Sequence, residues 1–373
     1  MTRLFVFGTL RWQPLLDAIA GRAVACTPAT LDGWRVERAA AGDWPVLVAG
    51  GQAAGLLTEP LDPEARARLD WYEVAFGYGF ETIEVETDDG PVTADVYRET
   101  GGKGGSGEPW DLDAWVARHG ERTLVASAEV LRAEGRLTPA EVQARRPVMH
   151  ARAQGVVMGR ATTRPITVGG TLDAADVHVE TIRHPYDGFH RVEEWVIDHA
   201  RFDGTRSGLL ERAISHVTDA VTVLPWDPVR DRVLVVEQIR IGALAKGDPR
   251  PWMIEPVAGL IDAGETAAST AVRETEEEAG LTITEADLHF VARYYPTPGG
   301  VAQVLHSYVA ICALPDDTGG LHGLVSEGED LRAHILPLDD LVAMIATGEA
   351  ANAPLIISAQ WLALHRERLR LNA

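Results

Sequence analysis

The chain has 373 residues, of which 46% are hydrophobic and 24% are charged, and its formal net charge at pH 7 is −21. This length exceeds what one hydrophobic core usually serves, so we expect two domains. The acidic balance argues against a nucleic-acid partner, which needs a basic surface. The sequence shows neither an uninterrupted apolar run of about 18 residues nor a secretory leader pattern, so we expect a soluble, cytoplasmic protein without a membrane partner.

The first part of the chain predicts a β-rich domain with helices at its end. Residues 4–10 form a short apolar run closed by a glycine turn, which predicts a buried strand entering a loop. Further strands are predicted around 45–48, 54–58, 82–86 and 92–97. The glycine-rich insert 101–107 predicts a flexible surface segment, because it lacks the spacing of a phosphate-binding loop. Helices are predicted near 112–134 and 139–152, the second capped by Thr138.

The pattern changes after Thr162, and we place the boundary at about residue 160, which gives domains 1–160 and 161–373. A final amphipathic helix is predicted over about 355–369. Strands are predicted at 177–182, 191–200, 220–224, 233–238, 290–294 and 305–312.

The most informative segment is an acidic cluster within residues 259–281. If this segment is helical, Glu274, Glu277 and Glu278 are spaced i, i+3 and i+4, so their carboxylates project from one face. These like charges repel one another, and a divalent cation turns that repulsion into binding. Hard oxygen ligands suit Mg²⁺ or Mn²⁺. The alternative interpretation is a solvated acidic helix face.

The same segment resembles the signature of the Nudix hydrolases, G-x5-E-x7-R-E-U-x-E-E-x-G-U, where U is a bulky apolar residue. The one departure is Thr275, where an aliphatic residue is usual. That position packs the helix onto the sheet, so the departure affects stability more than chemistry. The matching positions are Gly259, Glu265, Arg273, Glu274, Glu277, Glu278, Gly280 and Leu281.

Segments outside the signature resemble the ADP-ribose pyrophosphatases of this family. The resemblance implies a catalytic group of Glu327 as general base with Glu277 and Arg273, and metal ligands Ala258 (through its carbonyl), Glu274, Glu278 and Glu329. It also implies that Arg240 and Glu255 line the substrate site, and that Pro296 marks specificity for ADP-ribose. Arg273 is expected to hold the glutamates by bidentate pairing. A surface ion pair remains the alternative for Arg240, as a solvated loop does for Glu327 and Glu329.

The loop Phe7-Gly8-Thr9-Leu10, together with Glu73 and Tyr78, resembles the gamma-glutamylcyclotransferase family and its AIG2-like members. The resemblance implies that backbone amides of this loop hold the gamma-glutamyl carboxylate, where glycine permits a close approach. It implies that Glu73 acts as acid and base while the substrate's amino group attacks its own side-chain amide to give 5-oxoproline. Val74 replaces a usual glycine, so an active cyclotransferase and a barrel kept for binding or assembly both stay open.

Together the resemblances imply a mixed α and β protein: a small gamma-glutamylcyclotransferase-like β-barrel domain with helices, followed by a Nudix α/β/α sandwich with a mixed sheet. Such fusions resemble the Nudix proteins associated with tellurite resistance in bacteria. The main expectation is a homodimer that hydrolyses ADP-ribose to AMP and ribose 5-phosphate with Mg²⁺, or with Mn²⁺ instead. The alternatives are another nucleotide sugar such as GDP-mannose, a non-catalytic nucleotide sensor, or a cyclotransferase regulated by its Nudix domain.

Overall fold

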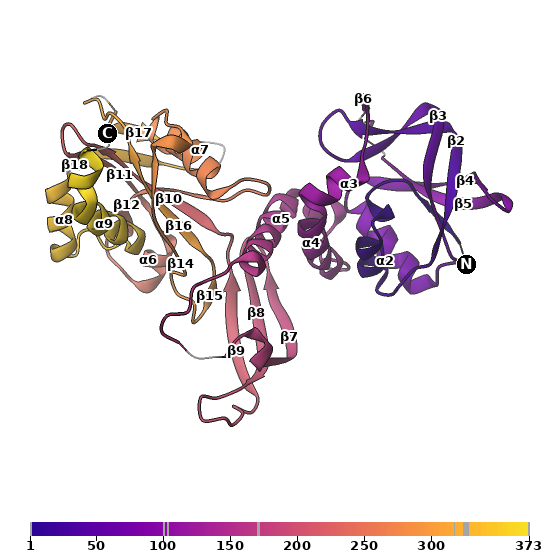
Figure 1. Ribbon diagram of the computed structural model, residues 1–373, viewed down its shortest axis with the longest axis horizontal. Coiled ribbons are helices and arrows are strands. Elements are labelled where there is room, and N and C mark those ends of the chain that lie inside the picture. The colour runs from indigo at the N-terminus through magenta and orange to yellow at the C-terminus, as the bar shows by residue number, and fades with distance from the viewer. Residues whose placement is uncertain are drawn as a thin grey trace. The chain divides into compact units, whose positions relative to one another are not determined.

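The computed structural model describes residues 2–99, 101–102, 104–169, 172–316, 318–323 and 328–371. The chain divides into two compact units, Met1–Thr163 and Arg164–Ala373, which Figure 1 shows in the indigo-to-magenta and the pink-to-yellow parts of the ribbon. Within the described residues no helix is long and apolar enough to cross a membrane.

A closed barrel of five strands forms the first unit. The order β3-β1-β5-β4-β2 returns to β3, because β2 pairs with β3, and β6 adds to the other edge of β2. Closure leaves these five strands without an open edge. The strands are β1 (Leu4–Val6), β2 (Cys26–Ala39), β3 (Pro45–Thr58), β4 (Tyr78–Thr87), β5 (Gly90–Glu99) and β6 (Gly105–Pro109).

Two predictions for this barrel are wrong. Residues 45–58 form the single strand β3, although two strands were predicted, because Gly50 and Gly51 adopt φ of +98° and +88° and pass through a register shift against β2. Left-handed backbone of this kind suits glycine. In addition, part of the insert predicted to be flexible forms β6, which pairs with β2.

Helices cover one side of this barrel. Alternation along β1 builds two cores, since Phe5 and Phe7 join the barrel interior while Leu4 and Val6 pack with the helices. The last helix starts at the capping box of Thr138 and Glu141. It extends beyond the predicted end. The helical elements are η1 (Thr9–Arg11), α1 (Gln13–Ala20), α2 (Pro63–Val74), α3 (Leu112–Trp115), the π-helical turn η2 (Val116–Gly120), α4 (Glu121–Arg132) and α5 (Pro139–Ala161).

A mixed sheet of eight strands forms the centre of the second unit. Its order is β14-β16-β10-β11-β18-β17, with β13 pairing with β10 and β12 with β11. β10 and β16 are parallel, and the other pairs are antiparallel. The strands are β10 (Ala220–Asp227), β11 (Arg232–Ile239), β12 (Trp252–Glu255), β13 (Val257–Leu260), β14 (Leu288–Tyr294), β16 (Leu305–Ile311), β17 (Gly320–His322) and β18 (Leu331–Pro337).

Helices lie on both faces of this sheet, which confirms the predicted α/β/α sandwich (Figure 1). Val221 and Val223 of β10 pack in the core that α7 covers, whereas Leu224 and Trp226 pack in the core beneath α8 and α9. A strand buried on both faces needs this continuous apolar run. The helices are α6 (Ile241–Lys246), α7 (Ala267–Ala279), the short η4 (Glu285–Asp287), α8 (Leu338–Thr347) and α9 (Ala353–Arg370).

A separate sheet of four strands consists of three strands that precede the sandwich in the chain and one later strand. The third of these strands was not predicted, because its residues are exposed or half-buried throughout and show no buried alternation. The elements are η3 (Ala174–Asp176), β7 (Val177–Asp187), β8 (Arg191–His199), β9 (Leu210–His216) and β15 (Val301–Ala302).

Candidate active sites

The acidic cluster lies on α7, a helix whose ends are fixed by its own sequence. Thr266 caps the start, where its Oγ1 accepts a hydrogen bond from the Ser269 amide at 3.0 Å. Gly280 ends the helix with φ of +62°, and its amide donates to the Glu276 carbonyl at 2.9 Å. The helix packs against β13, so its acidic turn faces that strand.

Arg273 holds the neighbouring carboxylates together. Its Nε and Nη2 donate to the two oxygens of Glu265, each at 3.0 Å. Its Nη1 donates to Glu274 at 2.6 Å and to Glu277 at 2.9 Å. The hydrogen bonds to Glu265 raise the pKa of the guanidinium, which therefore stays charged. The geometry makes Arg273 a positioning residue for three glutamates.

Glu274 and Glu278 are the buried members of the cluster, with 9% and 1% of their surface exposed. Burial raises the pKa of Glu274 to about 7 and that of Glu278 to about 8. The carboxylate of Glu329 adds to both increases, which places it close to the pair. Buried like charges at this spacing disfavour their ionised forms, and a cation between them would reverse that preference.

The backbone of β13 fits closely beneath these two carboxylates. The Ala258 amide donates to Glu278 at 2.9 Å. A Cβ on Gly259 would lie 1.9 Å from the Glu274 carboxyl carbon, so only glycine leaves room for that side chain.

The donor set fits a hard divalent cation, since it consists of buried carboxylate oxygens beside a strand backbone. Within the described residues, no three His, Cys, Asp or Glu side chains are grouped closely enough to hold a metal ion. In this conformation Glu274 is bonded to Arg273 and Glu278 to the Ala258 amide. Metal binding at this cluster therefore requires the carboxylates to exchange these bonds.

Arg240 and Glu255 form one ion pair in which Nε donates to Glu255 Oε2 at 2.7 Å. Asn352 donates to the other oxygen at 2.8 Å, so the buried Glu255 is held on both sides. The Arg240 charge also lowers the pKa of Glu278, although burial dominates there. The contact of Asn352 with Glu255 was not predicted from the sequence. The sequence signal at Asn352 is that of a helix N-cap, and its Oδ1 does accept a hydrogen bond from the Leu355 amide at 3.1 Å.

Three further positions singled out in the sequence are Pro296, Glu327 and Thr275. Pro296 is exposed in the loop between β14 and β15. Glu327 lies outside the described residues. The departure at Thr275 is accommodated inside the helix, because its buried hydroxyl donates to the Ala271 carbonyl at 2.7 Å.

A second group of predicted residues gathers in the first unit. Phe7 and Leu10 are buried, and Gly8 approaches Pro45 so closely that a Cβ would lie 2.5 Å from the proline Cγ. Thr9 begins the short helix η1. The Tyr78 hydroxyl donates to the Pro45 carbonyl at 3.3 Å. Pro45 therefore brings the loop and Tyr78 to the same place.

Glu73 lies in the last turn of α2 with 8% of its surface exposed. Burial raises its pKa to about 8, and no hydrogen bond to its carboxyl occurs within the described part of the chain. Tyr72 and Phe76 pack beside it with ring centroids 4.7 Å apart. Trp71 instead anchors α4, since its Nε1 donates to the Val130 carbonyl at 2.8 Å. At neutral pH Glu73 is an uncharged acid.

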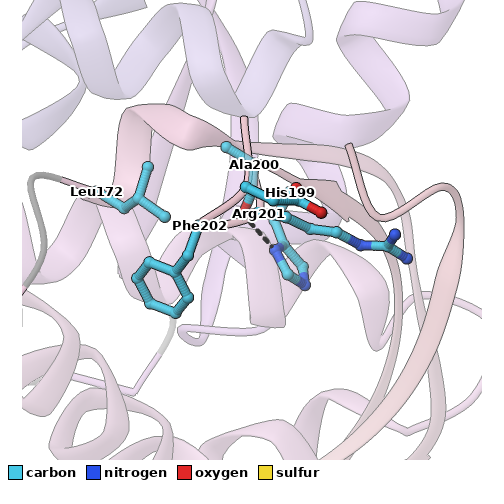
Figure 2. Close-up of a pocket in the computed structure, with 6 residues that line it drawn as sticks. Leu172, His199, Ala200, Arg201 and Phe202 are labelled. Carbon is cyan, nitrogen blue, oxygen red and sulfur yellow. Dashed lines mark hydrogen bonds between the residues drawn. The ribbon is translucent and has the colours of Figure 1, made fainter. Parts of the chain in front are cut away.

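A recess of about 480 Å³ in the second unit is distinct from both groups. Figure 2 shows its apolar wall, with Leu172 and Phe202 beside His199, whose Nδ1 donates to the Ala200 carbonyl at 2.8 Å. None of the residues predicted for the two sites lines it. The lining is Leu172, His199, Ala200, Arg201, Phe202 and Asp203.

Two family models match the chain at the places where these groups lie. The NUDIX domain model matches residues 216–358, and the model described as gamma-glutamyl cyclotransferase, AIG2-like, matches residues 4–115. The chain belongs to the Nudix hydrolase family and carries an AIG2-like domain ahead of the Nudix domain.

Its curated relatives include pyrophosphatases of two kinds. The ADP-ribose pyrophosphatase of Escherichia coli (strain K12) is 35% identical over 210 residues, which cover 56% of this chain and 97% of the relative. The ADP-ribose pyrophosphatase of Haemophilus influenzae is 31% identical, and the match covers 50% of this chain and 85% of the relative. The GDP-mannose pyrophosphatase of Citrobacter koseri is 29% identical, and the match covers 39% of this chain and 73% of the relative. A solved structure of an ADP compounds hydrolase matches with a TM-score of 0.38 and 22% identity, covering 52% of this chain and 97% of its own.

Replacing Gly259 tests the close fit beneath Glu274. We expect Gly259→Ala to displace the Glu274 carboxyl and weaken Mn²⁺ binding by about 10-fold or more, measured by electron paramagnetic resonance of the free ion. Gly242→Ala is the control, because a Cβ there meets no atom within 4 Å. Equal Mn²⁺ affinities for the two variants would contradict this account of the cluster.

Glu73→Gln tests the buried neutral acid through stability. Below pH 4.5 the carboxyl is protonated whether the chain is folded or unfolded; between pH 4.5 and about 8 only the unfolded state ionises, so wild-type stability falls as pH rises. The free energy of unfolding of Glu73→Gln, relative to that of the wild type, should therefore increase by up to about 1.4 kcal/mol per pH unit across that window and then level off.

Hydrogen exchange of peptides from α2 at increasing urea measures this difference in the full chain. The exposed Glu84→Gln on β4 is the control and should follow the wild-type pH dependence. Parallel pH profiles for wild type and Glu73→Gln would rule out a raised pKa at Glu73.

Proposed function

We propose that the second unit hydrolyses the pyrophosphate bond of ADP-ribose to AMP and ribose 5-phosphate, with Mg²⁺ as its ion and Mn²⁺ as a substitute. The observation that carries the proposal is the buried pair Glu274 and Glu278 within the matched Nudix signature, where Arg273 holds Glu274 and the Ala258 amide holds Glu278. The E. coli relative at 35% identity is an ADP-ribose pyrophosphatase, which supports this substrate.

The proposed roles combine the contacts of the described side chains with the resemblance to the Nudix signature. A divalent cation bound here would neutralise the diphosphate oxygens and lower the pKa of a water molecule. Glu274, Glu278, Glu329 and the Ala258 carbonyl would hold it. Arg273 keeps the glutamates in place, Glu277 completes the acidic face, and Glu327 would accept the proton of the attacking water.

The substrate side is assigned to Arg240, Glu255 and Pro296. Asn352 and Arg240 fix the buried Glu255 from opposite oxygens, so its carboxylate presents a rigid acceptor edge. Pro296 lies in an exposed loop, where it can limit which sugar fits. The relative from Citrobacter koseri makes GDP-mannose the competing substrate.

We further propose that this protein is a homodimer through the four-stranded sheet. That sheet carries apolar side chains that a lone subunit leaves in water, and burying them between two copies would be favourable. The exposed members are Val177, Val179, Ile182, Tyr186 and Phe189.

The main test is incubation with ADP-ribose and GDP-mannose, with and without Mg²⁺, with products identified by mass. We expect Mg²⁺-dependent AMP and ribose 5-phosphate, and Glu278→Gln should lower turnover by more than about 100-fold. Glu276→Gln is the matched control, because Glu276 is exposed on the same helix and should leave the rate unchanged.

Near-wild-type turnover of Glu278→Gln would contradict the assigned site. Faster release of GMP from GDP-mannose than of AMP from ADP-ribose would keep the site and replace the substrate.

A second activity is proposed for the first unit, because Glu73 is a buried, uncharged acid that raises the pKa of Tyr78 beyond the effect of burial, and the Tyr78 hydroxyl meets Pro45 beside Gly8 of the predicted loop. In a gamma-glutamyl compound the α-amino nitrogen would attack the γ-carbonyl carbon, forming the ring bond of 5-oxoproline and breaking the bond to the leaving amine. The uncharged Glu73 would donate its own proton to that amine and would be restored by the proton of the attacking nitrogen. No water is consumed.

Release of 5-oxoproline from gamma-glutamyl dipeptides, measured by chromatography, tests this second activity. We expect Glu73→Gln to lower it by about 10²- to 10⁴-fold, because the amide cannot relay the proton. The exposed Glu84→Gln should keep it. A rate unaffected by Glu73→Gln would remove Glu73 from the mechanism.

A further inference from the structure

Arg146 of α5 lies beside the aromatic residues that pack around Glu73, and Arg122 of α4 is joined to the same helix α5 through Gln154. The start of α5 meets the turn after α2, where Gln143 Nε2 lies 3.4 Å from the Cβ position of Gly77. One turn on, the Arg146 guanidinium lies over the Phe76 ring, 4.8 Å from its centroid. Phe76 in turn packs on Tyr72, the residue before Glu73.

Arg146 and Glu73 have opposite effects on the same two tyrosines. Burial is the main reason that the pKa of Tyr72 and of Tyr78 is raised; the charge of Glu73 raises it further and that of Arg146 lowers it. Burial alone raises the pKa of Glu73, so Arg146 is not its ion-pair partner. Arg146 and Glu73 are therefore both near Tyr72 and Tyr78 without being paired with each other.

Neither arginine is neutralised by a carboxylate of the described residues. Arg146 has only the Phe76 ring and the tyrosines as opposing groups. Arg122 places Nη2 2.8 Å from His119 Nδ1 and Nη1 3.4 Å from Gln154 Oε1, while its buried Nε has no partner among the described atoms. Burial lowers the pKa of both guanidinium groups, and Arg146 lowers that of Arg122 further.

A nearby carboxylate, that of Asp43, is already engaged by Arg118 and His119. Burial, followed by the charges of Arg146 and Arg122, lowers the pKa of His150 to about 3, so His150 is neutral. His119, which faces Arg122, has its Nε2 2.8 Å from Asp43 and is thereby already partnered. An arginine cannot escape such a site by losing its proton, as a histidine can.

Another arginine of the same helices does have a carboxylate partner. Arg152 of α5 forms a buried ion pair with Glu129 of α4, and the charge of Arg145, next to Arg146, adds slightly to the hydrogen bonds of Thr138 that lower the pKa of Glu141. With 55 acidic and 34 basic residues, carboxylates are plentiful. Part of the Arg146 side chain is nevertheless exposed to solvent, and the protein around the rest of it lowers the pKa of the guanidinium by partial burial. A partly buried cation that solvent can still reach suits a ligand that brings its own negative charge.

We propose that Arg122 and Arg146 form a carboxylate-binding subsite that recognises the leaving amino acid of a gamma-glutamyl compound. The proposal rests on the cyclotransferase activity assigned to Glu73 above. It gives this unit a substrate class: gamma-glutamyl amino acids or peptides, whose leaving amine carries a carboxylate, in preference to gamma-glutamylamines, which lack one. Both arginines lie beyond residues 4–115, so the subsite comes from the helical extension and not from the part that the family model matches.

The test compares two compounds that differ by one carboxylate, gamma-glutamylalanine and gamma-glutamylethylamide. We expect Arg146→Ala and Arg122→Ala each to lower kcat/KM for 5-oxoproline release from gamma-glutamylalanine by about 10- to 100-fold. Release from the ethylamide should change by less than about 3-fold, because it makes no contact with the missing charge. Arg145→Ala removes the same charge one position away and should leave both rates unchanged.

An equal loss on both compounds, or no loss on either, would overturn the subsite. If wild type releases 5-oxoproline from neither compound, the cyclotransferase proposal fails, and titration calorimetry of the Glu73→Gln protein decides the subsite separately. Binding of gamma-glutamylalanine that Arg146→Ala weakens would uphold it. Tighter, Arg146-dependent binding of inorganic phosphate would overturn the carboxylate assignment in favour of a phosphate-bearing ligand.

Discussion

The second unit depends on one planar cation held among carboxylates. Glu274, Glu277 and Glu278 share one helical turn and would repel one another if nothing lay between them. The Arg273 guanidinium offers five donors in a fixed plane, two of which engage Glu265 while another meets Glu274 and Glu277. Because Arg273 also donates to the Leu260 carbonyl, the same group docks α7 on β13. One side chain therefore both offsets the negative charge of the glutamates and fixes α7 on β13.

The two units use buried carboxyl groups in opposite ways. Glu73 has no cation beside it, so removal from water keeps it protonated and able to move a proton. Glu274 and Glu278 are also desolvated, but they lie beside Arg273, a strand backbone and Glu329, which favours a cation as the missing partner. In the roles we propose, the same residue type would serve proton transfer in one unit and ion binding in the other, and the difference lies in the neighbours.

The parts that were predictable from sequence carry their signals within a few residues. The spacing along α7 predicted its helix and its acidic face, and Thr138 with Glu141 predicted where α5 starts. Long-range contacts were not predictable. The passage of β3 through Gly50 depends on its pairing with β2, the role of Asn352 depends on a strand far earlier in the chain, and the isolation of Arg146 from carboxylates is a property of folded surroundings.

The bond between Asn352 and Glu255 spans 97 positions. As a ribosome makes the chain, α7 and most strands of the sandwich emerge well before Asn352 does. Until then one oxygen of Glu255 lacks its donor, and Arg240 alone holds the carboxylate through the other oxygen. The contacts that fix Glu255 are therefore completed late in synthesis, after the acidic helix has been made. A nascent chain halted before α9 would hold its acidic helix but lack one of the two donors that fix Glu255.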